Sequence, residues 1–458
     1  MAELEKIALN YSVRSAQSRP EPLPGAFFWL TAFYVVYCAR PEDWVPGLNY
    51  LPLAKITGIC VLIALFFSIG RAKRRIRDLP REGLYLIALV AFLLLTSVFS
   101  PVWKGGAFNH SLDFAKVAIA WILTFLITTN FSRLRRIMFI QTASVAAVAL
   151  ISVLKGGDTL RLKGVLRGVY QNSNDLAFVI VLAIPFCFAF LLRRRGVPHK
   201  IIWILAMFTM TCGVFLTASR AGFIELAITG IMCLWHFGVK GKRPQIILAF
   251  AIVGVILLFG VGRKLQQRFS AMSGEVNSKL DQTAYGSYQE RRQLMLLSLE
   301  TVARYPVFGI GVKNFTSYSG YWKEVHNCYL EIAAEGGIPA LILYLLFFRR
   351  GFVNLKRLRR MDLDPETALF TRALHASLIG FVTGAFFAPE AYQFFPYFAV
   401  AQTTSLWALI QERVPARIVT GVNESYTGFD HRQSTSPHPA WQPQPEFTSS
   451  MFGLNLLL

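Results

Sequence analysis

The sequence contains few charged residues, and acidic residues are the scarcest among them. Charged residues make up 16% of the 458 positions, whereas soluble domains have about 25%. Hydrophobic residues make up 54%, and the mean hydropathy is +0.44. This composition excludes a soluble globular enzyme and predicts an all-α integral membrane protein.

Recognisable metal and redox motifs are also missing. No CxxC pair and no Cys/His metal spacing occurs, and most cysteines lie in apolar runs, where they act as small hydrophobic residues. Cys328 is two residues from His326, a spacing at which helical side chains do not face each other, so we expect no catalytic Cys-His pair. Since no carboxylate cluster suits Mg²⁺ either, we predict no metal and no cofactor. The cysteines are Cys38, Cys60, Cys187, Cys212, Cys233 and Cys328.

Apolar runs dominate what is present. Runs of roughly 17 to 20 residues can cross about 30 Å of hydrocarbon as a helix. We predict about twelve membrane spans, of which some are shorter or interrupted by proline. They lie near residues 25–39, 51–70, 83–100, 113–130, 137–154, 175–192, 201–218, 221–238, 245–262, 337–348, 370–387 and 396–410.

Basic residues are grouped in alternate connections between these runs. Since positively charged loops remain in the cytoplasm, we expect both termini to be cytoplasmic. The first apolar run lacks a small-residue cleavage site and is expected to be a retained span. The net charge of +21 then reflects topology. Because the basic blocks have no interleaved aromatic residues, we expect the lipid bilayer, and no nucleic acid, as a partner.

The runs define five parts of the chain. We expect a cytoplasmic segment at 1–24, spans one to nine at 25–262, a large periplasmic loop with short helices at 263–336, spans ten to twelve at 337–412, and a disordered cytoplasmic tail at 413–458. The tail is rich in Ser, Pro and Gln, which is typical of disorder. The large outer loop is therefore the main candidate for chemistry.

The loop at 155–178 carries basic residues on the outer side, against the usual topological rule. Arg167 and its basic neighbours there predict an anionic ligand or lipid headgroups. Asn172 and Asn174 have amides that could bind hydroxyls. Capping of the next helix by Asn174 or Asp175 is the alternative interpretation.

A second polar place is TASRAGF at 217–223, where two predicted spans meet. Arg220 there costs free energy in hydrocarbon unless it faces the bundle interior or extends to the interface. The neighbouring Ser219 and Gly222 indicate a tight turn that presents the guanidinium inward, with Glu225 as its expected partner. Extension toward lipid phosphates is the alternative.

The third place is the long outer loop. Apolar residues at helical spacing follow Arg291, and this predicted helix ends at Pro306. A second short helix is predicted over HNCYLEIAAE, with His326 at its start. An imidazole with an ordinary pKa of about 6.5 is suited to accept a proton from a hydroxyl.

Together these motifs resemble the O-antigen ligase superfamily, the Wzy_C domain group. The resemblance rests on the order RGVYQNSN, ASRAG, an arginine fifteen positions before the proline of ARYPVFGIGVKNF, and HNCYLE before a glycine-rich helix entry. It covers roughly residues 155–350. Ser173 and Met295 depart from residues that are often found at these places in the family.

The resemblance implies a metal-independent glycosyltransferase of the inner membrane. Such proteins move a glycan from an undecaprenyl-pyrophosphate carrier to a hydroxyl acceptor on the periplasmic face, with inversion. By this resemblance His326 is the general base, while Arg220 and Arg291 hold the pyrophosphate and Arg167 assists. Substrate-binding roles are expected for Asn172, Asn174, Asn327, Tyr329 and Glu331.

Several alternatives stay open at this point. The acceptor could be lipid A core in lipopolysaccharide biosynthesis, a protein Ser or Thr, or a growing polysaccharide, so ligase, polymerase and O-oligosaccharyltransferase share one chemistry. A multi-span transporter, for instance of bicarbonate, is the alternative from another class, and it would place its site near the midplane between related halves. A purely structural protein is the least specific interpretation.

Overall fold

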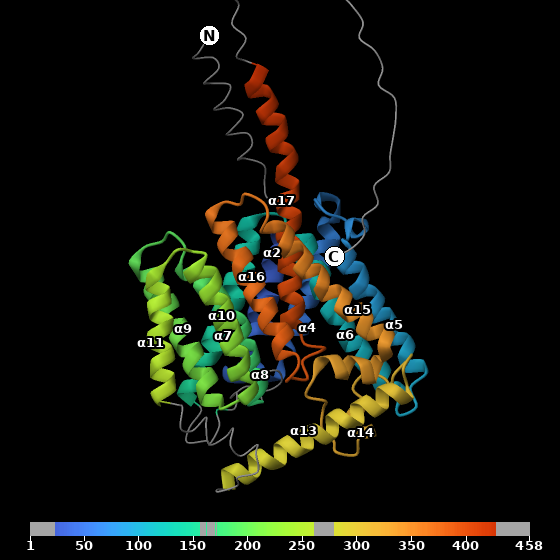
Figure 1. Ribbon diagram of the computed structural model, residues 1–458. Coiled ribbons are helices and arrows are strands. Elements are labelled where there is room, and N and C mark those ends of the chain that lie inside the picture. The colour runs from blue at the N-terminus through green and yellow to red at the C-terminus, as the bar shows by residue number, and fades with distance from the viewer. Residues whose placement is uncertain (1–22, 156–161, 163–169, 171, 261–278, 427–458) are drawn as a thin grey trace, which may run out of the picture. The chain divides into compact units, whose positions relative to one another are not determined.

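A computed structural model describes residues 23–155, 162, 170, 172–260 and 279–426 (Figure 1). The chain divides into two compact units, Met1–Gln411 and Glu412–Leu458, and the helical bundle belongs to the first. All secondary structure among the described residues is helical. The prediction of an all-α membrane protein is therefore confirmed.

Each predicted span coincides with a helix of the structure. The helices are α2 (Pro24–Ala39), α4 (Leu53–Ser68), α5 (Arg81–Val98), α6 (Lys104–Ile127), α7 (Phe131–Lys155), α8 (Ser173–Leu191), α9 (Val197–Thr217), α10 (Arg220–Cys233), α11 (Pro244–Gly260), α15 (Cys328–Leu358), α16 (Pro365–Gly384) and α17 (Phe394–Tyr426). Among the described residues, eight helices are long and apolar enough to cross a membrane. The exact number of spans stays a prediction. Helix α17 continues past Arg413, where the sequence places the start of the tail.

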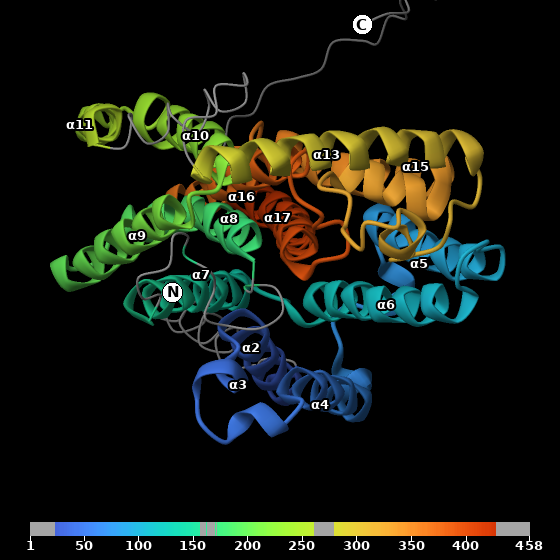
Figure 2. The ribbon, with the colours of Figure 1, turned by 90° about the horizontal axis from the view of Figure 1, so that it is seen from below.

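The remaining elements lie between these helices, and all except α13 are short. They are α3 (Pro41–Trp44), η1 (Leu48–Tyr50), η2 (Ile69–Arg71), η3 (Ile76–Asp78), η5 (Leu234–Val239), α13 (Lys279–Arg304) and α14 (Phe315–Tyr318). Helix α13 confirms the helix predicted in the outer loop, and it ends before Pro306 as expected. It packs against α15 (Figure 2).

Helix α8 lies at the centre of its neighbours. It packs against α7, α9, α10 and α16 (Figure 2). In its most apolar 18-residue stretch 83% is buried, compared with 17% in the corresponding stretch that begins with α4. Helix α4 exposes large apolar side chains such as Phe66 and Phe67, which are 72% and 81% exposed. Exposed apolar surface of this kind is what a lipid environment stabilises.

Helix α15 is broken at Gly337, which has a φ of 79°. Two backbone acceptors lose their partners within the helix there, because Pro339 has no N–H for the carbonyl of Glu335 and the N–H of Ile338 donates to Pro306 instead, at 2.8 Å. The segment before α14 supplies the missing donors. Ile310 donates to the Ala334 carbonyl at 3.0 Å and Gly311 to the Glu335 carbonyl at 2.8 Å.

This exchange of backbone hydrogen bonds fixes the segment between α13 and α14 to the bundle. Buried backbone groups must be paired, so residues 306–311 and the break in α15 stabilise each other. A small apolar cluster, formed by Leu294, Ile310, Phe315, Val325 and Ala334, joins α13 to the same region. The loop therefore holds α13 and the start of α15 at the same end of the bundle.

Candidate functional site

A pocket of about 280 Å³ lies where the start of α10, helix α13 and the start of α15 meet. Three residues predicted to form the reaction centre, Arg220, Arg291 and His326, line this pocket together. The complete lining is Arg220, Ala221, Ile224, Arg291, Arg292, Met295, Val325, His326, Asn327, Phe386 and Phe387.

The turn between α9 and α10 positions Arg220. Ala218 adopts a left-handed conformation with a φ of 47°, and Ser219 caps α10 by accepting a hydrogen bond from the N–H of Gly222 at 3.1 Å. A Cβ atom on Gly222 would lie only 2.7 Å from the Cβ of Ala177 on α8. The glycine thus lets α10 approach α8 closely, and Arg220 begins a helix that is fixed at its first turn.

The two asparagines of the 155–178 loop have structural contacts. Asn172 caps α8 by accepting from the N–H of Asn174 at 3.1 Å, so the cap is neither Asn174 nor Asp175. The hydroxyl of Ser219 donates to Oδ1 of Asn174 at 2.7 Å, which joins the starts of α8 and α10. Neither asparagine is among the lining residues, and Arg167 lies outside the described residues.

His326 lies partly buried in the connection that precedes α15. Its Nδ1 atom is buried and has no hydrogen-bond partner among the described residues. Burial, together with the charge of Arg291, lowers the pKa of this imidazole from 6.5 to about 4, against the opposing effect of Glu324. His326 is therefore neutral at physiological pH, and a neutral imidazole can accept a proton.

The residues that follow His326 anchor the start of α15. Asn327 caps the helix by accepting from the N–H groups of Tyr329 and Leu330, at 3.0 and 3.1 Å, and it also lines the pocket. Tyr329 donates to the carbonyl of Val382 at 2.9 Å. Its ring packs on Phe386, a lining residue, at 4.8 Å between centroids. Tyr329 thus supports the pocket wall from behind.

Glu331 belongs to a buried charge cluster next to the pocket. Its side chain is 1% exposed and pairs with Nζ of Lys313 at 2.9 Å, while Glu324 binds the same ammonium at 2.7 Å. Burial opposes the charge on Lys313, but Glu331, Glu324 and Glu335 outweigh it and hold its pKa well above the ordinary value. Oε2 of Glu331 also accepts from the N–H of Ala391 at 3.3 Å.

The sequence interpretation did not single out Lys313 or Glu390. Glu390 is 2% exposed, and burial raises its pKa well above the ordinary value, with the nearby charge of Asp175 acting in the same direction. The signal that could have identified Lys313 was its position in FGIGVKNF, where a charged residue follows two glycines inside an aromatic-rich segment. Nothing comparable marks Glu390 in the sequence.

Glu225 was expected to pair with Arg220. Its carboxyl group instead packs against α16, close enough that a Cβ on Gly384 would lie 2.7 Å from Cδ of Glu225. Its Oε1 atom has no hydrogen-bond partner in the part of the chain that the structure describes. Over the same residues, no group of three His, Cys, Asp or Glu side chains is placed to hold a metal ion.

Comparison with known proteins gives one match that agrees with this geometry. A family model described as Wzy_C, O-antigen ligase, matches residues 205–345, which include α10, α13 and the start of α15. No curated protein matches the chain. The resemblance inferred from the motifs is confirmed over the matched residues.

Proposed function

Because residues 205–345 resemble the O-antigen ligase family, we propose that this chain is a membrane glycosyltransferase of that type. Its donor would be a glycan linked to a polyprenyl diphosphate, and its acceptor a hydroxyl group at the periplasmic face. The observation that carries the proposal is the meeting of Arg220, Arg291 and His326 in one pocket. Two guanidinium groups suit a diphosphate, and an imidazole suits a hydroxyl.

The chemical step is a direct displacement at the anomeric carbon. Neutral His326 takes the proton of the acceptor hydroxyl while the acceptor oxygen bonds to the anomeric carbon from the side opposite the diphosphate. The bond between that carbon and the diphosphate oxygen breaks, and the electron pair leaves with the diphosphate. Arg220 and Arg291 stabilise the charge that develops there, and the sugar configuration inverts.

The lowered pKa of His326 fits this sequence of events. Burial and the charge of Arg291 disfavour the imidazolium ion. A bound diphosphate brings negative charge beside Arg291, which offsets that charge and raises the pKa of His326 toward its ordinary value. The base would thus become strongest when the donor is bound.

Three acceptors fit the same pocket chemistry. Lipid A core, a protein Ser or Thr, and the end of a growing glycan all offer a hydroxyl nucleophile, so polymerase and protein O-oligosaccharyltransferase are variants of the proposed activity. The alternative of another class, a solute transporter, needs a site between related halves near the membrane midplane. The position of the pocket at the first turn of α10 and the start of α15 favours the enzyme.

Glycan transfer in isolated membranes tests this proposal. Membranes that contain the lipid-linked donor are mixed with each acceptor class, and transferred glycan is measured. We expect His326→Ala and Arg220→Lys each to lower transfer at least about tenfold, since Lys cannot hold phosphate oxygens bidentately. Arg304→Lys is the control, because Arg304 is exposed on α13 and does not line the pocket. Full transfer by His326→Ala would exclude the base assignment.

A further inference from the structure

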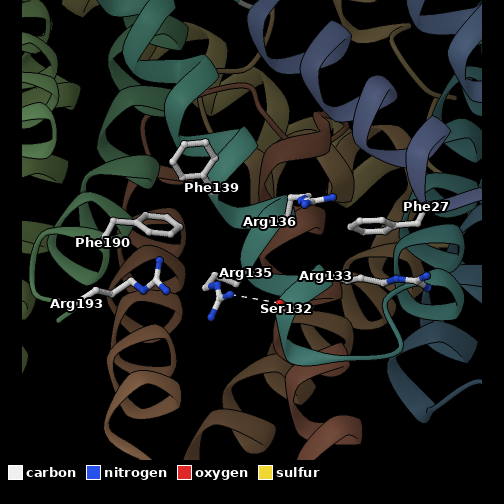
Figure 3. Close-up of a pocket in the computed structure, with 8 residues that line it drawn as sticks. All are labelled: Phe27, Ser132, Arg133, Arg135, Arg136, Phe139, Phe190 and Arg193. Carbon is white, nitrogen blue, oxygen red and sulfur yellow. Dashed lines mark hydrogen bonds between the residues drawn. The ribbon is translucent and has the colours of Figure 1, made fainter. Parts of the chain in front are cut away.

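We propose that a second pocket, at the opposite end of α8 from the first turn of α10, binds the phosphate headgroup of an anionic membrane lipid. The pocket has a volume of about 270 Å³ and contains four arginines and three phenylalanines (Figure 3). Its lining is Phe27, Ser132, Arg133, Arg135, Arg136, Phe139, Phe190 and Arg193. This proposal is independent of the glycan transfer proposed for the first pocket.

The arginines come from two helix ends. The first turns of α7 supply Arg133, Arg135 and Arg136, and Arg193 follows the last turn of α8. A single carboxylate, Glu366, binds both Arg135 at 3.1 Å and Arg193 at 2.6 Å. Arg136 has no ion pair within the described part of the chain. Over the described residues, Arg135, Arg136 and Arg193 therefore carry more positive charge than Glu366 neutralises, and an anion would balance it.

Several of these groups are held in place before any ligand binds. Arg133 is 2% exposed and donates through Nη1 to the Ile127 carbonyl at 3.1 Å and to Thr129 Oγ1 at 3.2 Å. Its guanidinium lies over the ring of Phe27 at 4.8 Å. Arg135 donates to Ser132 Oγ at 3.3 Å, as Figure 3 shows. Groups that are already fixed lose little freedom on binding, which favours affinity.

The aromatic residues favour a lipid over a free phosphate ion. Phe27, Phe139 and Phe190 give the pocket apolar walls (Figure 3). Phe139 is 43% exposed on α7, which is long and apolar enough to cross a membrane, so its ring borders hydrocarbon. A phosphodiester headgroup places its anion among the guanidiniums and its glycerol and acyl parts along these rings. A role in membrane topology alone would require only that these arginines lie on the cytoplasmic side. It would require neither the carboxylate that two of them share nor the apolar walls.

Thermal unfolding of the purified full-length protein in detergent tests the proposal. The midpoint Tm is measured during titration with phosphatidylglycerol, phosphatidylcholine or sodium phosphate. We expect phosphatidylglycerol to raise Tm, because a ligand that binds only the folded state stabilises it. Arg136→Gln/Arg193→Gln should need about tenfold more of this lipid for the same rise, since two guanidinium contacts are lost.

A matched control removes the same charge nearby. Arg194→Gln/Arg195→Gln removes two exposed arginines that do not line the pocket, and it should respond to phosphatidylglycerol as the natural protein does. If the pocket variant does not fold, Arg136→Gln alone serves, because Arg136 is exposed and outside the Glu366 pairs. Equal responses of pocket and control variants, or an equal effect of phosphatidylcholine or sodium phosphate, would overturn the lipid assignment.

Discussion

At the scale of single residues, His326 is a buried base whose neighbours disfavour its charged form. Burial and Arg291 lower its pKa to about 4, so the folded protein resists protonation between pH 6.5 and 4. The unfolded chain takes up a proton over the same range. Folding stability therefore decreases as the pH falls through this window, and the full penalty is present below the folded pKa.

Replacing His326 should remove this pH dependence. We expect the natural protein to lose up to about 3 kcal/mol of stability between pH 7 and 4 through this residue. His326→Gln should lose that much less over the same window. Thermal unfolding of both proteins across the pH range measures the difference, and parallel curves would show that His326 is not buried in its neutral form.

Lys313 forms ion pairs with Glu324 and Glu331 that only the folded chain brings together. The predicted helix pattern of the outer loop gave no reason to connect it with Glu331, which is 18 positions later and 1% exposed. The sequence analysis singles out Arg220 at a turn between two predicted spans, and Arg291 and His326 beside predicted helices of the outer loop. Lys313 was missed because its role depends on a contact between two separate segments.

Replacing Lys313 alone should therefore lower the free energy of unfolding more than replacing Lys313 and Glu331 together. Lys313→Met leaves buried Glu331 without its cation, and we expect a loss of about 3 kcal/mol. Lys313→Met/Glu331→Gln should recover a large part of that loss, since no buried charge then remains unpaired at this position. Unfolding free energies of the two single variants and the double variant give the coupling. Additive losses would contradict the pairing.

At the scale of elements, the apolar runs predicted the helices because a lipid-embedded backbone must satisfy its own hydrogen bonds. The sequence predicts a short helix over HNCYLEIAAE and a separate span from about residue 337, and the break of α15 at Gly337 divides the helix in this way. That break is stabilised by residues 306–311, whose N–H groups bind the carbonyls freed there. A helix pattern alone carries no record of donors that come from another segment.

Gly337 should consequently be hard to replace. A Cβ at this position would lie 2.1 Å from the Val307 carbonyl oxygen, and its φ is 79°. We expect Gly337→Ala to destabilise the protein by about 3 kcal/mol or more. Gly351→Ala in the same helix is the control, because its Cβ would lie no closer than 3.4 Å to a neighbour. Equal melting temperatures of the two variants would argue against the break.

At the scale of the whole molecule, the two ends of α8 lie beside two pockets of different composition. The start of α8 is joined to the start of α10, beside the pocket with His326. The far end of α8 leads into Arg193 and the arginine-rich pocket. The grouping of basic residues in the sequence predicts that the first end is periplasmic and the second cytoplasmic.

Cysteine accessibility can test this orientation in intact cells. Tyr321, 48% exposed near the His326 end, and Arg195, exposed after α8, are replaced one at a time by cysteine. A thiol reagent that cannot cross the inner membrane should label Tyr321→Cys directly and Arg195→Cys only after the cells are opened. The parent protein, whose six cysteines are free, gives the background. The reverse order of labelling would invert the predicted topology.

The close approach of α10 and α8 at Gly222 also limits which residues related sequences can have there. With 2.7 Å between a Cβ there and Ala177, the combined volume at these two positions is already at its limit. Homologous chains should therefore keep that sum nearly constant and enlarge one position only where the other shrinks. The distance between the two helices would then be kept by paired substitutions at positions 177 and 222.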